Sequence, residues 1–180
     1  SMEEEAQSFV DEAKGVTNAK EALAGAKDII AEAVSDEADY RTRIRDLTMK
    51  KGHVTSTAKD PEAESVYEMY YEFDEPVNKL AGHRILALNR GENEKILNVK
   101  VEAPEEDILR FLERKVITRD NPNTTPVLKE VVADAYDRLI APAIEREIRS
   151  SLTEMAEDGA IRVFGKNLEH FLMQPPIAGQ

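Results

Sequence analysis

The last third of the sequence most constrains the fold, because an apolar pattern of helical period runs from Thr125 to Gln174 with one interruption at Pro142. This pattern predicts a helix over Val127–Ile140 and a longer helix that begins at Pro142. An unbroken helix of that length spans roughly 50 Å at 1.5 Å per residue. We therefore expect it to be a spine against which other elements pack. Its apolar or small positions are Ile144, Ile148, Leu152, Met155, Ala156, Gly159, Ala160, Val163, Phe164, Leu168, Phe171 and Leu172.

The first third of the sequence predicts a run of three short helices. The first is expected to end near Gly15, because Asn18 is typical of a residue that caps a new helix. Ser35 or Asp36 caps a third helix, which ends in a basic turn followed by Gly52. Helices this short, joined by such brief connections, favour antiparallel packing.

Two segments depart from the helical pattern and predict strands. Residues His53–Ala58 are rich in β-branched side chains, and residues Ile96–Glu102 alternate between apolar and polar from Leu97 onward. We expect the two segments to pair as a small antiparallel ribbon that leans on helices, since two strands alone are marginally stable. The fold class is therefore mainly α, with a multi-helix N-terminal region, a two-stranded antiparallel ribbon and a long C-terminal spine helix.

The segment between the two predicted strands reads as helical. A helix is expected to begin at Asp60-Pro61, and its aromatic face carries Tyr67, Tyr70 and Phe73. A second short helix is expected over His83–Asn89. After the second strand, Pro104 and the acids that follow it mark a strong helix start, and residues 121–126 form the clearest loop.

Composition limits the classes of function. The formal net charge is −12 and there are no cysteines, so zinc ribbons, iron–sulfur clusters and thiol nucleophiles are excluded. An acidic surface repels phosphate backbones, although a local basic face is compatible with any net charge. No stretch reaches the roughly 20 apolar residues of a membrane helix, and no secretory leader is recognised. We expect a cytoplasmic protein that binds no membrane.

The two ends of the sequence suggest an excised piece of a longer protein. Ser1-Met2 reads as a remnant of tag removal, and the segment from Pro175 to Gln180 reads as cut rather than finished.

No catalytic constellation emerges from the residue pattern. The glycines match neither of the common phosphate-binding loops, no serine lies in a nucleophile elbow, and carboxylate clusters occur mainly at expected helix starts and turns. The histidines lack the spacing of helical metal ligands; they are His53, His83 and His170. We therefore predict no catalytic residue, no metal and no cofactor.

Clustered basic residues are the only candidates for nucleic-acid contact. His83, Arg84 and Arg90 lie at the two ends of one expected helix. The third expected helix carries Arg41, Arg43 and Arg45, followed by Lys50 and Lys51. A third cluster is Arg110, Arg114, Lys115 and Arg119. For each cluster, a solvated face that balances neighbouring acids is the competing interpretation. The tyrosine-rich segment is threaded with acids, so packing is favoured there over base stacking.

Four segments resemble the Tex family of bacterial RNA-binding transcription accessory proteins. They are Lys59–Ser65, His83–Glu92, Arg138–Arg149 and Gln174–Pro176, in the family's order. The resemblance implies a multi-domain protein in which a helical N-terminal region precedes an RNase H-like domain, helix-hairpin-helix elements and a C-terminal OB-fold that binds RNA. This chain is similar to the later part of the helical region and would end before the RNase H-like domain.

The resemblance implies a domain plan and a function. Residues 1–2 are the tag remnant, residues 3–120 form a helical lobe with the β-ribbon, and residues 121–180 form a helical segment that leads toward the RNase H-like domain. We expect a scaffold segment rather than an enzyme, with RNA or DNA bound by other domains, weakly or not at all by this chain, and with the transcription machinery as a further partner. Two alternatives stay open: a helix-turn-helix-like face that binds nucleic acid directly, and a protein-interaction module.

Overall fold

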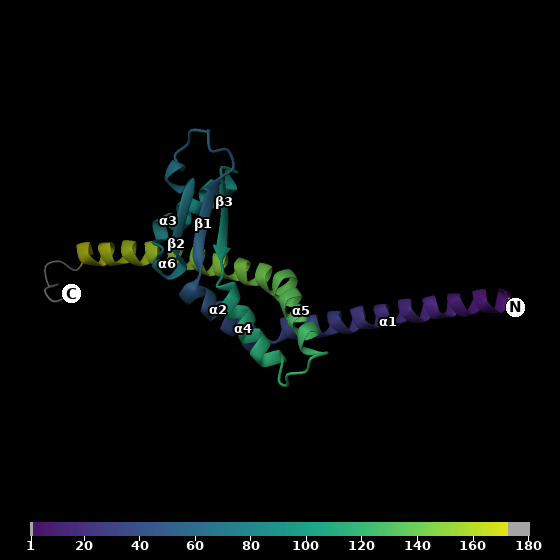
Figure 1. Ribbon diagram of the computed structural model, residues 1–180. Coiled ribbons are helices and arrows are strands. Elements are labelled where there is room, and N and C mark those ends of the chain that lie inside the picture. Colours follow the sequence, from purple (N-terminus) through teal and green to yellow (C-terminus); the bar gives the residue numbers. More distant parts are fainter. Residues whose placement is uncertain (1, 173–180) are drawn as a thin grey trace. The chain divides into compact units, whose positions relative to one another are not determined.

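The computed structural model describes residues 2–172, and the side chains within that range except those at 16, 17 and 160–172. Helices make up most of the described chain, which confirms the mainly α prediction (Figure 1). The elements in chain order are α1 (Met2–Asp36), α2 (Ala38–Lys51), β1 (His53–Ala58), η1 (Glu68–Tyr70), β2 (Glu72–Pro76), η2 (Val77–Lys79), α3 (Gly82–Asn93), β3 (Leu97–Glu102), α4 (Glu105–Val116), α5 (Thr125–Ala135), η3 (Tyr136–Ile140) and α6 (Ala141–Leu172).

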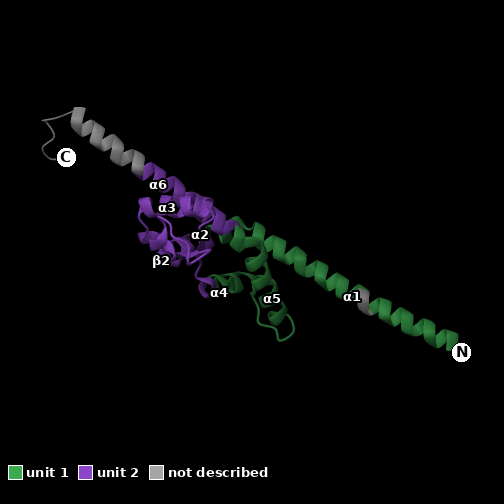
Figure 2. Ribbon diagram, turned by 90° about the horizontal axis from the view of Figure 1, so that it is seen from above, with its two compact units in different colours: residues 1–42, 108–142 green, residues 43–107, 143–180 purple. Residues whose placement is uncertain are grey.

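The chain divides into two compact units that are not consecutive in sequence (Figure 2). Unit 1 comprises residues 1–42 and 108–142, and unit 2 comprises residues 43–107 and 143–180. The predicted division into residues 3–120 and 121–180 concerns the organisation of a longer protein, and it stays a prediction.

Unit 1 is built on the packing of α1 against α5. Ala31 and Val34 of α1 are buried, as are Val131 and Val132 of α5. Ile30 of α1 is half-buried, and Lys27 lies 3.6 Å from a carboxylate oxygen of Glu130. The apolar side of α1 is therefore covered only toward its C-terminal end.

The predicted break in the first helical segment was wrong. Helix α1 runs without interruption from Met2 to Asp36, through Gly15 and Asn18. Gly in a helix interior costs only about 1 kcal/mol relative to Ala, and the Ala-, Glu- and Lys-rich sequence around Gly15 favours helix strongly enough to outweigh that cost. No proline lies in this segment to impose a break.

Unit 2 contains an antiparallel sheet with the strand order β2-β1-β3. The first predicted strand has the predicted bounds, and the second begins one residue later than predicted, at Leu97. The two pair as expected, with Val54 opposite Val101. The prediction of a two-stranded ribbon was nevertheless wrong, because β2 pairs with the other edge of β1 and places Phe73 opposite Ser56. The acidic sequence of β2 has little intrinsic strand preference, so cross-strand pairing and packing decide its conformation.

The helix predicted from Asp60-Pro61 is also absent. This segment is a turn, in which the backbone N–H of Glu62 donates to the side chain of Asp60 at 3.1 Å. Aspartate side chains form such turns readily, and this local hydrogen bond competes with helix formation. Two of the aromatic residues that follow, Tyr70 and Phe73, lie in η1 and β2. Their rings pack edge-to-face with centroids 5.3 Å apart.

The core of unit 2 lies between the sheet and the helices α3 and α6. Leu88 of α3, Leu97 of β3 and Ile148 of α6 are fully buried. Two glycines are required by close packing: a Cβ on Gly52 would lie 2.5 Å from the Thr48 carbonyl oxygen, and Gly91 lies against Leu97. Gly52 ends α2 as predicted.

The predicted division at Pro142 takes the form of a π-helical turn rather than a break. The turn spans Tyr136–Ile140, and the N–H of Ala141 donates to the carbonyl of Tyr136. Proline cannot donate a helical hydrogen bond, and the wider turn accommodates it while the chain stays helical. In α6, Ile144, Ile148, Leu152 and Ala156 are buried as predicted, whereas Met155 is exposed. The predicted apolar positions from Ala160 to Leu172, the side chain of His170 and residues 174–176 lie outside what the structure describes.

Candidate functional site: a polar network between α3 and α6

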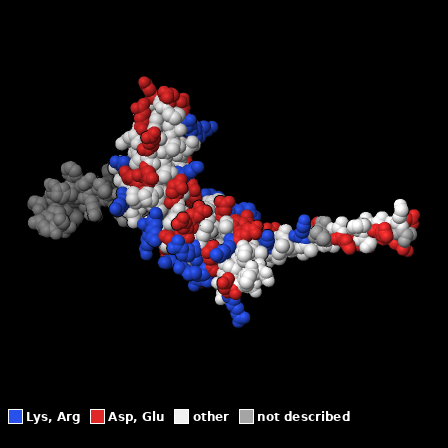
Figure 3. Space-filling model, in the orientation of Figure 1, with Lys and Arg blue, Asp and Glu red and all other residues white. Residues whose placement is uncertain are grey.

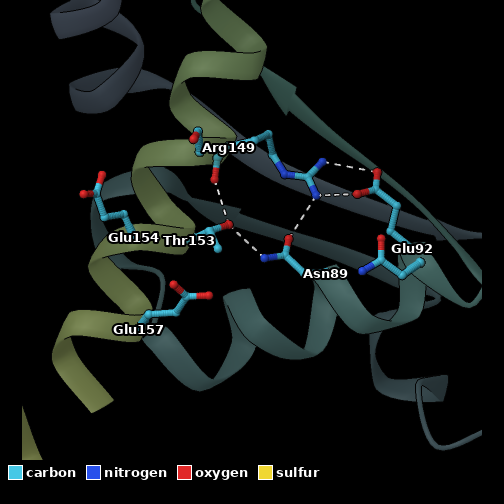
Figure 4. Close-up of a pocket in the computed structure, with 8 residues that line it drawn as sticks. Asn89, Glu92, Arg149, Thr153, Glu154 and Glu157 are labelled. Carbon is cyan, nitrogen blue, oxygen red and sulfur yellow. Dashed lines mark hydrogen bonds and ion pairs between the residues drawn. The ribbon is translucent and has the colours of Figure 1, made fainter. Parts of the chain in front are cut away.

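A charged side chain of α6 organises the most extensive polar network in the described part of unit 2. Arg149 donates to both carboxylate oxygens of Glu92 on α3, at 2.6 and 3.3 Å, and to the side-chain oxygen of Asn89 at 3.1 Å (Figure 4). It also reaches the carbonyl oxygen of Val99 on β3 at 3.4 Å. The guanidinium therefore connects α6 with both α3 and the sheet.

The second half of the network fixes the orientation of Asn89. The Asn89 side-chain N–H donates to the Thr153 hydroxyl at 2.8 Å, and that hydroxyl donates to the Arg149 carbonyl oxygen at 2.9 Å. Asn89 thus uses its oxygen for Arg149 and its nitrogen for Thr153. The Arg149 side chain is only 20% exposed and that of Glu92 is 40% exposed, so solvent screens this pair only partly.

An open polar groove of about 460 Å³ lies over this network. The lining residues contributed by α3 are Asn89, Glu92 and Asn93, and those contributed by α6 are Arg149, Ser150, Thr153, Glu154 and Glu157. In Figure 4 the side chains that line the groove come from these two helices alone. Because Arg149 is already neutralised by Glu92, the groove offers no free cation for an anionic ligand. Within the described residues, no cluster of three or more acidic or histidine side chains is placed to hold a metal ion.

The basic residues predicted on α3 have different environments. Arg84 donates to Glu75 at 3.1 Å and stacks over the Phe73 ring, with its guanidinium carbon 5.8 Å from the ring centroid. It therefore anchors α3 to β2. His83 and Arg90 are exposed at the two ends of the helix and are not brought together.

Arg90 contributes to the electrostatics around a buried tyrosine. The pKa of Tyr67 is raised from its usual value, mainly because its side chain hydrogen-bonds to Glu94 and is buried; Arg90 opposes this rise. Arg90 is thus part of a local charge balance at the end of α3.

The basic residues predicted on α2 are also separated by their contacts. Arg41 donates to the carbonyl oxygen of Ser35 at 2.7 Å, and Arg45 donates through its Nε to Glu147 on α6 at 2.9 Å. Arg43 is exposed and forms no ion pair with any residue whose side chain the structure describes. The structure therefore gives Arg41, Arg45 and Arg84 contacts within the fold. The contribution of all six residues to nucleic-acid binding stays a prediction.

The residues of the Arg149 network were not singled out from the sequence. Two of the family-like segments, His83–Glu92 and Arg138–Arg149, meet at this network, since they supply Asn89, Glu92 and Arg149. The signal that could have found the network is the presence of polar residues on the inner faces of two helices that both match the same family. Their pairing across 57 positions of sequence could not be read from local pattern.

The family model described as Tex central region-like matches residues 1–164. The chain belongs to the Tex family. The Bacillus subtilis protein YdcI is 46% identical over 178 residues, which cover 97% of this chain and 25% of that protein. Bordetella pertussis Protein tex is 30% identical over 187 residues, covering 95% of the chain and 24% of that protein.

A human protein belongs to the same set of relatives. S1 RNA-binding domain-containing protein 1 is 28% identical over 181 residues, covering 93% of the chain and 18% of that protein. The chain thus spans about a quarter of the length of the bacterial Tex relatives that it matches and less of the human one. Among the described residues, no helix has the length and apolar character that crossing a membrane requires.

Proposed function

We propose that this chain is a non-catalytic scaffold segment of a Tex-type transcription accessory protein, which binds nucleic acid through other domains. The observation that carries the proposal is that Arg149 hydrogen-bonds to both Glu92 and Asn89 of α3 and to the Val99 carbonyl of β3. These side chains therefore join α6, α3 and the sheet. A site for substrate needs polar groups directed at the substrate, whereas these groups are directed at their neighbours.

The remaining features of the groove support the same proposal. Covalent or general acid–base catalysis requires a nucleophile or base within hydrogen-bond reach of an orienting partner and of the substrate. The Thr153 hydroxyl donates to a backbone carbonyl of its own helix, so its hydrogen is not available for activation in this arrangement. Glu154 and Glu157 line the groove from α6. The acid that lines it from α3 is Glu92, which binds Arg149.

The partner class is proposed from charge and from the relatives. A net charge of −12 disfavours broad contact between this chain and a phosphate backbone. The human relative is named for an S1 RNA-binding domain, and the chain covers only 18% of that protein. We therefore assign RNA or DNA binding to the longer protein and the positioning of its domains to this chain, with the transcription machinery as the setting.

A second candidate function is direct contact between α2 and a nucleic-acid backbone. The observation that favours it is the exposed Arg43. Figure 3 shows Lys and Arg side chains gathered where α2 and α4 overlap in the view of Figure 1, while acidic side chains cover the loop between β1 and η1. This candidate predicts that Arg43→Glu weakens binding by the longer protein and reduces its salt dependence.

The scaffold proposal is tested by replacing this chain, within the longer protein, with a flexible glycine–serine linker of comparable reach. The remaining domains should stay folded, and RNA affinity should fall at least tenfold, because a flexible linker lowers the effective concentration of one binding domain near another. The matched control is the intact longer protein with Arg43→Glu, which should bind as the unmodified protein does. Unchanged affinity after linker replacement would refute the scaffold role.

The absence of catalysis is tested on the chain itself. We expect no turnover of nucleotides, RNA or DNA above a protein-free blank. Turnover that disappears with Glu157→Gln in the groove and persists with Glu62→Gln on the β1–η1 loop would place a catalytic site in the groove and contradict the proposal.

A further inference from the structure

Helix α1 has one apolar face that other residues cover only near the C-terminal end of the helix. Positions spaced by seven residues fall on nearly the same side of an α-helix, because seven residues make almost two turns. Met2, Phe9, Leu23 and Ile30 follow this spacing, and Val16 occupies the intermediate position in the sequence. The series is continuous over the length of the helix.

The same face is buried where unit 1 covers it and exposed elsewhere. Ala31 and Val34 are buried, and Ile30 is half-buried. Toward the N-terminus the exposure rises to 51% at Leu23, 73% at Phe9 and 84% at Met2. The face that packs within unit 1 therefore continues for about 37 Å, over residues 2–26 at 1.5 Å per residue, and its described side chains, which exclude those at 16 and 17, are uncovered.

Residues 2–26 of α1 are not expected to be stable as a helix without packing against another element. Residues 2–26 include Gly15 and Gly25, and nothing lies within 4 Å of the position that a Cβ would occupy at either glycine. Helices with little tertiary packing are marginal in water, and most helical stability in proteins comes from packing of an apolar face. A contiguous exposed apolar face of this length is typical of a surface that another element covers.

The properties of α1 restrict what that element can be. Residues 2–26 hold six acidic and two basic side chains, which leave a net charge of −4. A complementary surface is therefore apolar along its centre and basic along its edges. About three quarters of the length of the bacterial relatives lies outside the region that this chain matches, so the same polypeptide offers ample material for such a surface.

We infer that residues 2–26 of α1 dock onto an apolar, basic-edged surface in the remaining part of the same polypeptide, in continuation of the packing of Ala31 and Val34. This inference rests on the proposed scaffold function and names the surface through which the scaffold holds a neighbouring domain. The face that carries the contact includes Phe9 and Leu23, whereas Ile29, which is 69% exposed, lies on the opposite side of the helix.

The test places a photo-crosslinking phenylalanine analogue at Phe9 in the longer protein, with Ile29 as the matched control position. Equal amounts of protein with natural and heavy nitrogen are mixed before irradiation, and the crosslinked peptides are identified by mass spectrometry. Contact within one polypeptide gives crosslinks that are entirely light or entirely heavy. Contact with a second copy gives mixed pairs as well.

We expect unmixed crosslinks from Phe9 to a segment outside residues 1–180 that carries apolar residues flanked by Lys or Arg, and few or none from Ile29. Hydrogen exchange of residues 2–26 should also slow at least about 100-fold in the longer protein relative to the isolated chain, because a docked helix opens less often. Mixed pairs, crosslinks to another protein, no crosslink at Phe9, or equal crosslinking from both positions would each overturn the inference.

Failure of this inference is distinguishable from failure of the scaffold function. If linker replacement still weakens RNA binding while Phe9 gives no intramolecular crosslink, the scaffold acts through another surface. If linker replacement has no effect, the scaffold function itself fails, whatever Phe9 contacts.

Discussion

Removal of the Arg149 guanidinium tests how far the polar network stabilises unit 2. In Arg149→Ala, both oxygens of the Glu92 carboxylate lose their donors, the Asn89 side-chain oxygen loses its partner, and the Val99 carbonyl loses a longer contact. Hydrogen bonds to charged groups contribute about 1.5–3 kcal/mol each when well shielded. Because the two side chains are 20% and 40% exposed, we discount this and expect a total loss of about 2–3 kcal/mol.

The assay is urea unfolding of the chain followed by circular dichroism, with the free energy of unfolding taken from the midpoint and slope. Two controls separate the network from a general loss of charge. Arg138→Ala removes an i,i+4 pair with Asp134 in which both side chains are 50% exposed and a 3.7 Å pair with the exposed Asp28, and it should cost clearly less than Arg149→Ala. Arg149→Lys keeps the charge and loses the two-pronged geometry, so its cost should lie between those of the two alanine variants.

A double-mutant cycle then isolates the pair itself. Arg149→Ala and Glu92→Gln should couple by at least about 1 kcal/mol, because residues in direct contact are not additive. Equal, small effects of Arg149→Ala and Arg138→Ala, or additive effects of the two network variants, would refute the reasoning that this network joins the two helices and the sheet.

Three further changes have expected outcomes. Gly91→Ala should lower the free energy of unfolding by about 1–3 kcal/mol in urea melts, because the new Cβ would overlap a side-chain carbon of the buried Leu97; wild-type stability would contradict this. Lys95→Gly should raise the thermal midpoint, with a gain of about 0.5–1 kcal/mol, because Lys95 holds a φ of 63° just after α3, where glycine is favoured; an unchanged or lower midpoint would count against it. Since hydrogen bonding to Glu94 raises the pKa of Tyr67, the protonated phenol stabilises the fold below the unfolded pKa of about 10, and this contribution is lost as pH rises through the folded pKa. Tyr67→Phe should therefore make stability less dependent on pH above 10 in unfolding measurements, and an unchanged pH profile would disprove the assignment.

Elements with a clear local signal could be predicted from the sequence. The β-branched run in His53–Ala58 gave a strand with the observed bounds, and the alternation in Ile96–Glu102 gave a strand within one residue of the observed start. The proline that precedes α4 and the acids of its first turn indicated its start, and Gly52 marked the end of α2. In each case the local preference and the tertiary environment favour the same conformation.

Elements whose conformation depends on a distant partner could not be predicted in this way. Strand β2 has an acidic sequence and becomes a strand because β1 offers it an unpaired edge. The turn at Asp60 depends on a side-chain hydrogen bond that a periodicity argument does not weigh. At Pro142 the sequence indicated an interruption, but periodicity does not distinguish a break from a π-helical turn, which keeps the chain helical.

The candidate site shows the same limitation more strongly. Arg84 was noted for its charge, and its stacking on Phe73 depends on the unforeseen strand β2. Arg149 was noted only as the last residue of a family-like segment, and only the approach of α3 explains its partners Glu92 and Asn89. The family-like segments marked the right regions without identifying which side chains meet.

The most direct test of the central proposal is fluorescence anisotropy of labelled single-stranded RNA and duplex DNA, titrated with this chain and with the longer protein at roughly 50 and 200 mM salt. The account predicts binding by the longer protein and none by the chain at either salt concentration, which would place recognition outside residues 1–180. Binding by the chain at low salt that collapses at high salt, and that Arg43→Glu weakens, would contradict the scaffold account and identify a basic face on this acidic chain as a nucleic-acid site.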